Sequence, residues 1–252
     1  MEQKTGKLRF LSGNMLKIIA AISMLLDHIG VIFFPSVTAF RILGRLAFPI
    51  FAFMIAEGCK YTHHRLRYFL TVFLMGLGYS AVFYVYSKQL YFCILITFAC
   101  SIALIFALQE FKAALLSPTI GAIGKIIRGF LFVALIVCVF LFTKLFDVDY
   151  GFVGCIIPLL VSLCHAPKEN CPKLWKKLDC IPLSVLGLAI GLVFYIIVYG
   201  EFRIYSLLSI PLLLLYSGER GRCKMKYFFY VFYPAHLLTL EGIAMLLSIL
   251  QK

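Results

Sequence analysis

Residues 14–34 read NMLKIIAAISMLLDHIGVIFF, and residues 41–59 read RILGRLAFPIFAFMIAEGC. Each stretch matches the length of a helix that crosses a bilayer, which needs about 20 mostly apolar residues. Each stretch also contains ionisable side chains. An ionised side chain near the bilayer centre costs about 2.5–3.5 kcal/mol on insertion scales, so such a residue needs a pairing partner or a function. The two stretches therefore predict membrane-spanning helices that carry a polar site.

The rest of the chain has the same composition. Of its 252 residues, 63% are hydrophobic and only 14% are charged, yet the formal net charge is +13. A soluble domain is nearer half apolar and a quarter charged, so a soluble globular protein and a disordered chain are excluded. A soluble nucleic-acid-binding protein is also excluded, because the basic residues lie between apolar runs of bilayer length. We expect a multi-pass protein of the cell's inner or plasma membrane.

The expected fold class is all-α: a polytopic transmembrane helical bundle that forms a single domain over residues 1–252. No period-two alternation is present, which argues against a β-barrel. The hydropathy pattern gives about nine spans, within a range of eight to ten, and the sixth and eighth are short for a full crossing. The expected spans are 14–34, 41–59, 68–87, 90–111, 125–146, 150–165, 181–200, 202–217 and 227–250.

The basic residues predict how the bundle is oriented. Cytoplasmic loops of membrane proteins collect Lys and Arg. With a cytoplasmic N-terminus, nine spans put 17 of the 24 Lys and Arg residues inside. These inside residues attract anionic membrane lipid, and they also suit a phosphate-bearing ligand. They are Lys4, Lys7, Arg9, Lys60, Arg65, Arg67, Lys112, Lys125, Arg128, Lys168, Lys173, Lys176, Lys177, Arg220, Arg222, Lys224 and Lys226.

Ionisable residues within the first two spans define the clearest candidate site. Asp27 and His28 are adjacent, so their side chains leave the helix about 100° apart. Arg41 and Arg45 lie one turn apart and share a helix face. One interpretation is that Asp27 neutralises Arg41 or Arg45 as a buried pair, and the other is that these residues are catalytic. We expect Pro49 to kink the second span.

Two other segments supply candidates at the same membrane level. Asp149 lies in an acidic outer connection before the sixth span, and His236 lies in the last span. A lone intramembrane histidine is equally well explained as a hydrogen-bonded core residue, so His236 has two open interpretations. Cys171 and Cys180 share a loop but lack the spacing of metal ligands, so we expect no metal site.

Together, His28, His236, Asp27, Asp149 and Arg45 suit acyl transfer. A neutral imidazole can take a proton from an attacking amine or hydroxyl, while a fixed cation stabilises the oxyanion of the tetrahedral intermediate. The same residues suit a proton relay in a transporter, and side-chain chemistry alone leaves both functions open. The motifs of nucleotide hydrolases, zincins and serine hydrolases are missing from the sequence.

Several motifs resemble the TraX family, and the similarity extends over nearly the whole chain. It is most specific in the first sixty residues. The matching segments there are Leu16–Ile19, Ser23–Gly30, Phe34-Pro35 and Arg41–Phe53. Further matches are Glu57-Gly58, Asp149–Gly151 with Gly154, and Phe232–Pro234 with His236.

The resemblance implies an activity. TraX-like proteins are polytopic membrane proteins, and a well-known member is implicated in N-terminal acetylation of conjugative pilin. The Asp27-His28 element also resembles the integral-membrane acetyltransferases of the heparan-α-glucosaminide type, which take acetyl groups from acetyl-CoA. By this resemblance His28 is the catalytic histidine, oriented by Asp27 or Asp149, and the protein is an acetyl-CoA-dependent acetyltransferase.

The partners implied are acetyl-CoA and an acceptor that the sequence leaves open: a pilin N-terminus, a surface glycan, or a small amine or alcohol. Two alternative functions also stay open, a proton-coupled small-solute transporter and a non-catalytic protein of conjugation assembly. The phosphates of acetyl-CoA would bind the cytoplasmic basic loops. The candidate residues for that contact are Lys60, His63, Arg65, Arg67, Arg222 and Lys224.

Overall fold

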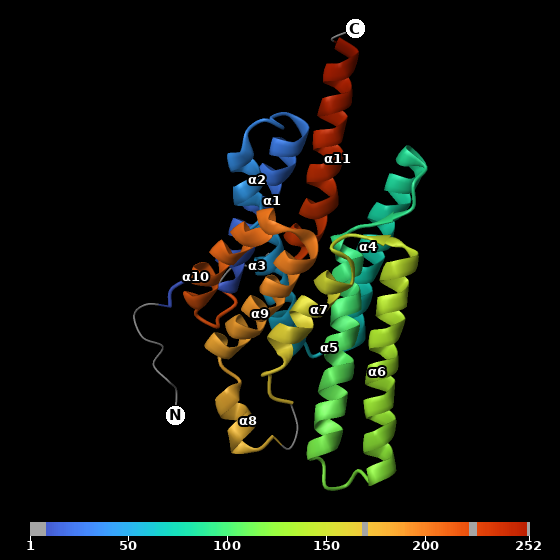
Figure 1. Ribbon diagram of the computed structural model, residues 1–252, viewed down its shortest axis with the longest axis vertical. Coiled ribbons are helices and arrows are strands. Elements are labelled where there is room, and N and C mark those ends of the chain that lie inside the picture. The colour runs from blue at the N-terminus through green and yellow to red at the C-terminus, as the bar shows by residue number, and fades with distance from the viewer. Residues whose placement is uncertain (1–8, 168–170, 222–225, 251–252) are drawn as a thin grey trace. The chain divides into compact units, whose positions relative to one another are not determined.

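The computed structural model describes residues 9–167, 171–221 and 226–250 (Figure 1). The regular elements of the described residues are helices apart from two strands of two residues each, so the expected all-α class is confirmed. The elements are α1 (Gly13–Ile32), α2 (Thr38–Gly44), α3 (Ala47–Tyr61), α4 (Arg65–Ser87), β1 (Tyr91–Phe92), α5 (Ile94–Leu116), α6 (Ala122–Leu145), β2 (Asp147–Val148), α7 (Gly151–Ser162), α8 (Lys173–Leu178), α9 (Ile181–Tyr199), the 3₁₀ helix η1 (Glu201–Leu208), α10 (Ser209–Leu214) and α11 (Lys226–Leu250).

Six helical segments among the described residues are long and apolar enough to cross a membrane. They are Gly13–Ile32, Thr38–Tyr61, Arg65–Val85, Ile94–Leu116, Ala122–Leu145 and Ile181–Tyr199. The expected sixth span is the short helix α7, and the expected eighth is divided between η1 and α10. The count of nine spans therefore stays a prediction, as does the cytoplasmic N-terminus.

The second expected span is interrupted. Helix α2 ends at Gly44 and α3 begins at Ala47, so the break lies at Arg45 and Leu46. Pro49 is the third residue of α3, where a missing backbone N–H costs no intrahelical hydrogen bond. Instead of the kink expected at Pro49, the span therefore has a break before this residue. This break places Arg45 at the end of α2.

The described residues form two compact units, and each is considered separately. The first unit contains Met1–Met54 and Ile196–Lys252. In it α1 packs against both α2 and α11, and η1 contacts α2 and α10. Backbone hydrogen bonds join the start of α1 to the segment after α10: Gly13 N donates to Glu219 O at 2.8 Å, and Asn14 N donates to Arg220 O at 3.0 Å. The beginning of α1 is therefore fixed within its unit.

Two glycines let α1 and α2 approach closely. A Cβ atom added at Gly30 would lie 2.5 Å from the Phe40 Cβ, and one added at Gly44 would lie 2.3 Å from the Asp27 Cβ. Real Cβ atoms do not come this near to other heavy atoms, so glycine is required at both contacts. The Gly44 contact presses Asp27 against α2, the helix that carries Arg41 and ends beside Arg45.

The second unit, Ile55–Tyr195, is built around α5. Helix α5 packs against α4, α6 and α7, and in Figure 1 α4, α5 and α6 run side by side in cyan to green. More than half of α5 is buried, whereas Val139 is the one buried residue of α6, as expected for a helix at the lipid face. Strands β1 and β2 pair in parallel, with Tyr91 opposite Asp147.

Candidate functional site

The two candidate catalytic histidines lie together in the first unit. His28 is on α1 and His236 is on α11. Their ring centroids are 5.1 Å apart, and the rings meet edge to face at 71°. The ring of Phe232 stacks on His236 at 4.9 Å. The sequence places these histidines more than two hundred positions apart, and the packing of α1 on α11 brings them into contact.

Both imidazoles are held in the same way. The Nδ1 atom of His28 lies 2.8 Å from the Met24 carbonyl oxygen, and the Nδ1 atom of His236 lies 2.8 Å from the Phe232 carbonyl oxygen. A carbonyl oxygen can only accept, so Nδ1 carries the donated proton and, in the neutral ring, Nε2 carries the lone pair. Each histidine thus presents Nε2 as a base.

The Nε2 atom of His236 is buried and has no hydrogen-bond partner among the described residues. We expected a carboxylate, Asp27 or Asp149, to orient His28. In the structure the backbone carbonyl of Met24 orients it instead. The reason is local: the carbonyl of the preceding helical turn lies within reach of Nδ1, whereas Asp27 contacts the arginines instead.

Asp27 pairs with both arginines. Its Oδ1 atom lies 3.2 Å from Arg41 Nε and 3.4 Å from Arg45 Nη2. The Arg45 side chain is 13% exposed, and its guanidinium lies 5.6 Å from the ring centroid of Phe202, a cation–π contact. Asp27 therefore pairs with both arginines at once, but only the pair with Arg45 is largely buried, because the Arg41 side chain is 39% exposed. One carboxylate faces two cations that stay protonated at any physiological pH.

Asp149 lies in the second unit, between β2 and α7. Its backbone N–H donates to Phe92 O at 2.9 Å, and its carbonyl accepts a hydrogen bond of 2.5 Å from the Thr97 hydroxyl. Burial, followed by the neighbouring Asp149 carboxylate, raises the pKa of Tyr91 above its ordinary value. Within its unit, Asp149 thus links the loop that precedes α7 to α5 and β1.

The residues expected to bind acetyl-CoA have different environments. Lys60 Nζ lies 2.6 Å from Asp179 Oδ1, and Arg65 is paired with Glu110. His63 and Arg67 are exposed. Arg222 and Lys224 lie outside the described residues. Of the four described candidates, His63 and Arg67 offer exposed side chains, whereas Lys60 and Arg65 already have acidic partners.

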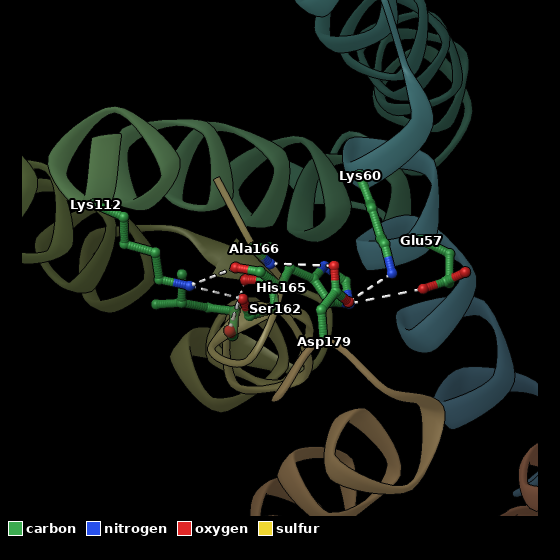
Figure 2. Close-up of polar contacts among 8 residues, drawn as sticks. Glu57, Lys60, Lys112, Ser162, His165, Ala166 and Asp179 are labelled. Atoms are coloured by element: carbon green, nitrogen blue, oxygen red, sulfur yellow. Dashed lines mark hydrogen bonds and ion pairs between the residues drawn. The ribbon is translucent and has the colours of Figure 1, made fainter. Parts of the chain in front are cut away.

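The second unit contains a polar cluster that sequence reasoning did not identify. It consists of Glu57 and Lys60 on α3, Lys112 on α5, His165 after α7, and Asp179 before α9 (Figure 2). Figure 2 shows these side chains converging on the segment Ser162–Ala166, which follows the last turn of α7. Asp179 accepts from Lys60 through Oδ1 and from the Ala166 N–H through Oδ2, the latter at 3.2 Å.

Lys112 closes the end of α7. Its ammonium group donates to the carbonyls of Ser162, Leu163 and His165 at 3.1, 2.7 and 3.2 Å. The last carbonyls of a helix have no intrahelical partner, and a cation at this end also interacts favourably with the helix dipole. Lys112 therefore acts as a buried cap of α7. No pattern in the sequence indicates this cap, because its two parts are fifty residues apart.

His165 is 1% exposed and lies outside the membrane-spanning helices. Burial, and then the positive charge of Lys60, lower its pKa to about 3. The ring is therefore neutral at pH 7, and the 3.6 Å separation of its Nε2 atom from Glu57 Oε1 is not an ion pair. The cluster carries two carboxylates and two ammonium groups around a neutral imidazole, so its charges balance.

Comparison with known proteins adds a family to this geometry. The family model described as TraX protein matches residues 12–244. A stretch of 40 residues is 48% identical to the uncharacterized protein RP591 of Rickettsia prowazekii (strain Madrid E), and it covers 16% of this chain and 16% of that protein. No solved structure matches. Because the family model spans nearly the whole chain, from the start of α1 into α11, this protein belongs to the TraX family of conjugation-associated membrane proteins.

Proposed function

We propose that the protein is an integral-membrane acyltransferase that moves an acetyl group from cytoplasmic acetyl-CoA to an amine or hydroxyl acceptor in or across the membrane. The contact between His28 and His236 is the observation that carries the proposal. Each imidazole is oriented by a backbone carbonyl so that Nε2 carries the lone pair in the neutral ring, and Asp27, which precedes His28, pairs with two arginines.

The proposed chemistry needs one base and one cation. As the acceptor nitrogen or oxygen attacks the acetyl carbonyl, His28 Nε2 takes the acceptor's proton. The carbonyl oxygen becomes an oxyanion, which the Arg45 guanidinium stabilises. When the tetrahedral intermediate collapses, the carbon–sulfur bond breaks, and the CoA thiolate takes the proton from the imidazolium. His236 supplies the second acid–base group of the pair.

Binding of acetyl-CoA depends on a separate set of residues. Its phosphates would contact exposed basic side chains: His63 in the connection after α3 and Arg67 in the first turn of α4. The acceptor belongs to one of three classes, a pilin N-terminus, a surface glycan, or a small amine or alcohol.

The decisive experiment uses the full chain in lipid nanodiscs. Acetyl-CoA and a panel of amines and alcohols are added, release of free CoA is followed with a thiol reagent, and the acetylated product is identified by mass spectrometry. We expect His28→Ala to reduce transfer by a factor of about 10²–10⁴, the usual contribution of a general base. Thr119→Ala serves as the control, because Thr119 lies on the exposed connection between α5 and α6.

A binding measurement provides a second test. A ligand that binds only the folded protein raises its melting temperature. CoA should therefore stabilise the wild type and the His28→Ala variant equally. Full activity of His28→Ala, or no transfer together with no stabilisation by CoA, would contradict the proposed function.

A further inference from the structure

Arg41 and Arg45 converge on a single oxygen atom. Both contact Asp27 Oδ1, through Nε of Arg41 and Nη2 of Arg45. A carboxylate and a guanidinium that serve only each other usually form two parallel hydrogen bonds, one to each oxygen. Neither arginine does so here. The contact neutralises part of their charge and leaves most of their N–H groups uncommitted.

The uncommitted donors include a buried atom. The Nε atom of Arg45 is inaccessible to solvent and has no hydrogen-bond partner within the described residues, whereas Arg41 Nε already faces Asp27 Oδ1. A buried N–H without an acceptor costs about 1–3 kcal/mol, and more when the group is charged. Such donors are retained where a ligand supplies the acceptor.

The charge of the group leads to the same conclusion. Two guanidinium groups and one carboxylate leave a net charge of one positive unit, and the ion pairs of both arginines among the described residues are those with Asp27. An uncompensated cation in a membrane protein is expensive and calls for an anion. Planar guanidinium groups match carboxylate and phosphate oxygens.

This group is next to the proposed base. Asp27 directly precedes His28 on α1, and Arg45 lies at the end of α2, which packs on α1. We propose that Arg41, with the charge of Arg45 beside it, binds an acidic group of the acceptor, so that the acetylated substrate is an amine or alcohol that also carries a carboxylate or phosphate. Arg45 keeps the role at the oxyanion proposed above. The inference rests on the acyltransferase function proposed above.

Two sources could supply the anion, the acceptor or the phosphates of CoA. Matched substrates separate them. Glycine and glycinamide share an amine but differ in the carboxylate, and glucosamine 6-phosphate and glucosamine differ in the phosphate. Acetyl-pantetheine transfers the same acetyl group as acetyl-CoA without its nucleotide phosphates. The assay measures kcat and KM for each pair in nanodiscs.

We expect the wild type to prefer the acidic member of at least one pair by about tenfold or more in kcat/KM, as charge-assisted hydrogen bonds provide. Arg41→Gln should bring this preference close to one, chiefly by raising KM for the acidic acceptor. Arg41→Lys should retain part of the preference, because lysine keeps the positive charge. It should not retain all of it, because lysine lacks the planar group of N–H donors that matches a carboxylate or phosphate. Arg203→Gln, which removes the same charge elsewhere in the first unit, should leave the preference intact.

Several outcomes would overturn the inference. Equal use of acidic and neutral acceptors by the wild type is one, and an equal loss for all acceptors in Arg41→Gln is another. A third is that the effect of Arg41→Gln disappears with acetyl-pantetheine, which would assign the arginines to the donor.

Failure of the proposed function has a different result, namely no transfer to any acceptor. In that case the shift in melting temperature on adding each ligand shows whether the arginines form an anion site. Stabilisation by glucosamine 6-phosphate but not by glucosamine, lost in Arg41→Gln, supports an anion site without acetyl transfer. The same stabilisation of Arg41→Gln and the wild type rules the site out.

Discussion

The two units of the protein each contain a group of charged side chains, and the groups differ in charge balance. In the second unit, Glu57 and Asp179 are matched by Lys60 and Lys112. In the first unit, Asp27 alone is matched against two arginines. Balanced and well-partnered charges hold chain segments together, whereas an excess charge with free donors has no structural benefit that offsets its cost. The comparison supports the proposal that the reaction takes place in the first unit.

The histidines differ in a parallel way. His28 and His236 are each oriented by the backbone carbonyl of the preceding helical turn. His165 is enclosed in the balanced cluster, and neither of its ring nitrogens makes a hydrogen bond within the described residues. The histidines therefore differ in orientation: a backbone carbonyl fixes the rings of His28 and His236, and no hydrogen bond within the described residues fixes that of His165.

The largest effect on stability is expected for Asp27→Asn. The substitution leaves two guanidinium groups beside each other with no anion, and loss of one partner of a buried ion pair costs about 3–5 kcal/mol. Because Asp27 is 23% exposed, we expect about 3 kcal/mol, the lower end of this range. Thermal unfolding in one detergent measures it. Arg41→Gln is the matched control and should lower the free energy of unfolding much less, because it leaves one carboxylate paired with one guanidinium. An equal loss in both variants would contradict the difference in charge balance between the two units.

Lys112→Met should come next. It removes three donations to the carbonyls that end α7 and leaves those buried groups without partners, at a cost of about 2–3 kcal/mol. The free energy of unfolding, or a lowered melting temperature, is the measurement. Lys125→Met is the control, because Lys125 makes one solvent-exposed bond to the Leu115 carbonyl. If both variants are equally stable, Lys112 is not the cap of α7.

Gly44→Ala tests the close contact between α1 and α2. The new Cβ atom would overlap the Asp27 side chain, so the helices must separate, at a cost of about 1–3 kcal/mol. We expect lower stability and a weaker Asp27–Arg45 contact, seen as reduced acetyl transfer. Gly78→Ala in α4 has open space around it and should be neutral or slightly stabilising, as alanine favours a helix. Stability of Gly44→Ala equal to the wild type would contradict the close contact.

The last expected effect is a pH dependence that originates from His165. Its pKa is about 3 in the folded protein, against about 6.5 in an unfolded chain. The unfolded state therefore binds a proton below pH 6.5 that the folded state does not bind until about pH 3. This contribution to stability is complete above pH 6.5 and is lost as the pH falls, about 2 kcal/mol of it by pH 5.

Comparison of melting temperatures at pH 7 and pH 5 measures this dependence. His165→Gln should show a smaller decrease than the wild type, because it cannot take up the proton. His64→Gln, at an exposed position, is the matched control and should behave as the wild type does. An unchanged decrease in His165→Gln would show that other groups govern acid sensitivity.

Much of the fold could be predicted because apolar runs of bilayer length are a local property of the sequence. The helices from α1 to α6 and α9 fall close to the expected spans, and the segments expected to be short are short. The break at Arg45 could not be predicted, since it depends on how α2 packs on α1 at Gly44 rather than on Pro49.

The candidate site was predicted in part for a similar reason. Asp27, His28, Arg41 and Arg45 are ionisable residues in apolar stretches, which the sequence alone makes conspicuous. Lys112, His165 and Asp179 were missed, because each lies near a helix end where charged residues are ordinary. Their burial becomes visible only when α5, α7 and the start of α9 are brought together around Ser162–Ala166.

The sequence by itself determined that this is a helical membrane protein with charged residues in its first two spans, because hydrophobicity and charge are carried by each residue regardless of its neighbours. Only the tertiary structure decided which charges neutralise each other. Pairing depends on distances of a few ångströms, since Coulomb energies in a low-dielectric interior change steeply with separation. In the structure Asp27 pairs with both Arg41 and Arg45, and His28 contacts His236. In the second unit the acidic and basic side chains of the cluster balance each other and hold its segments together.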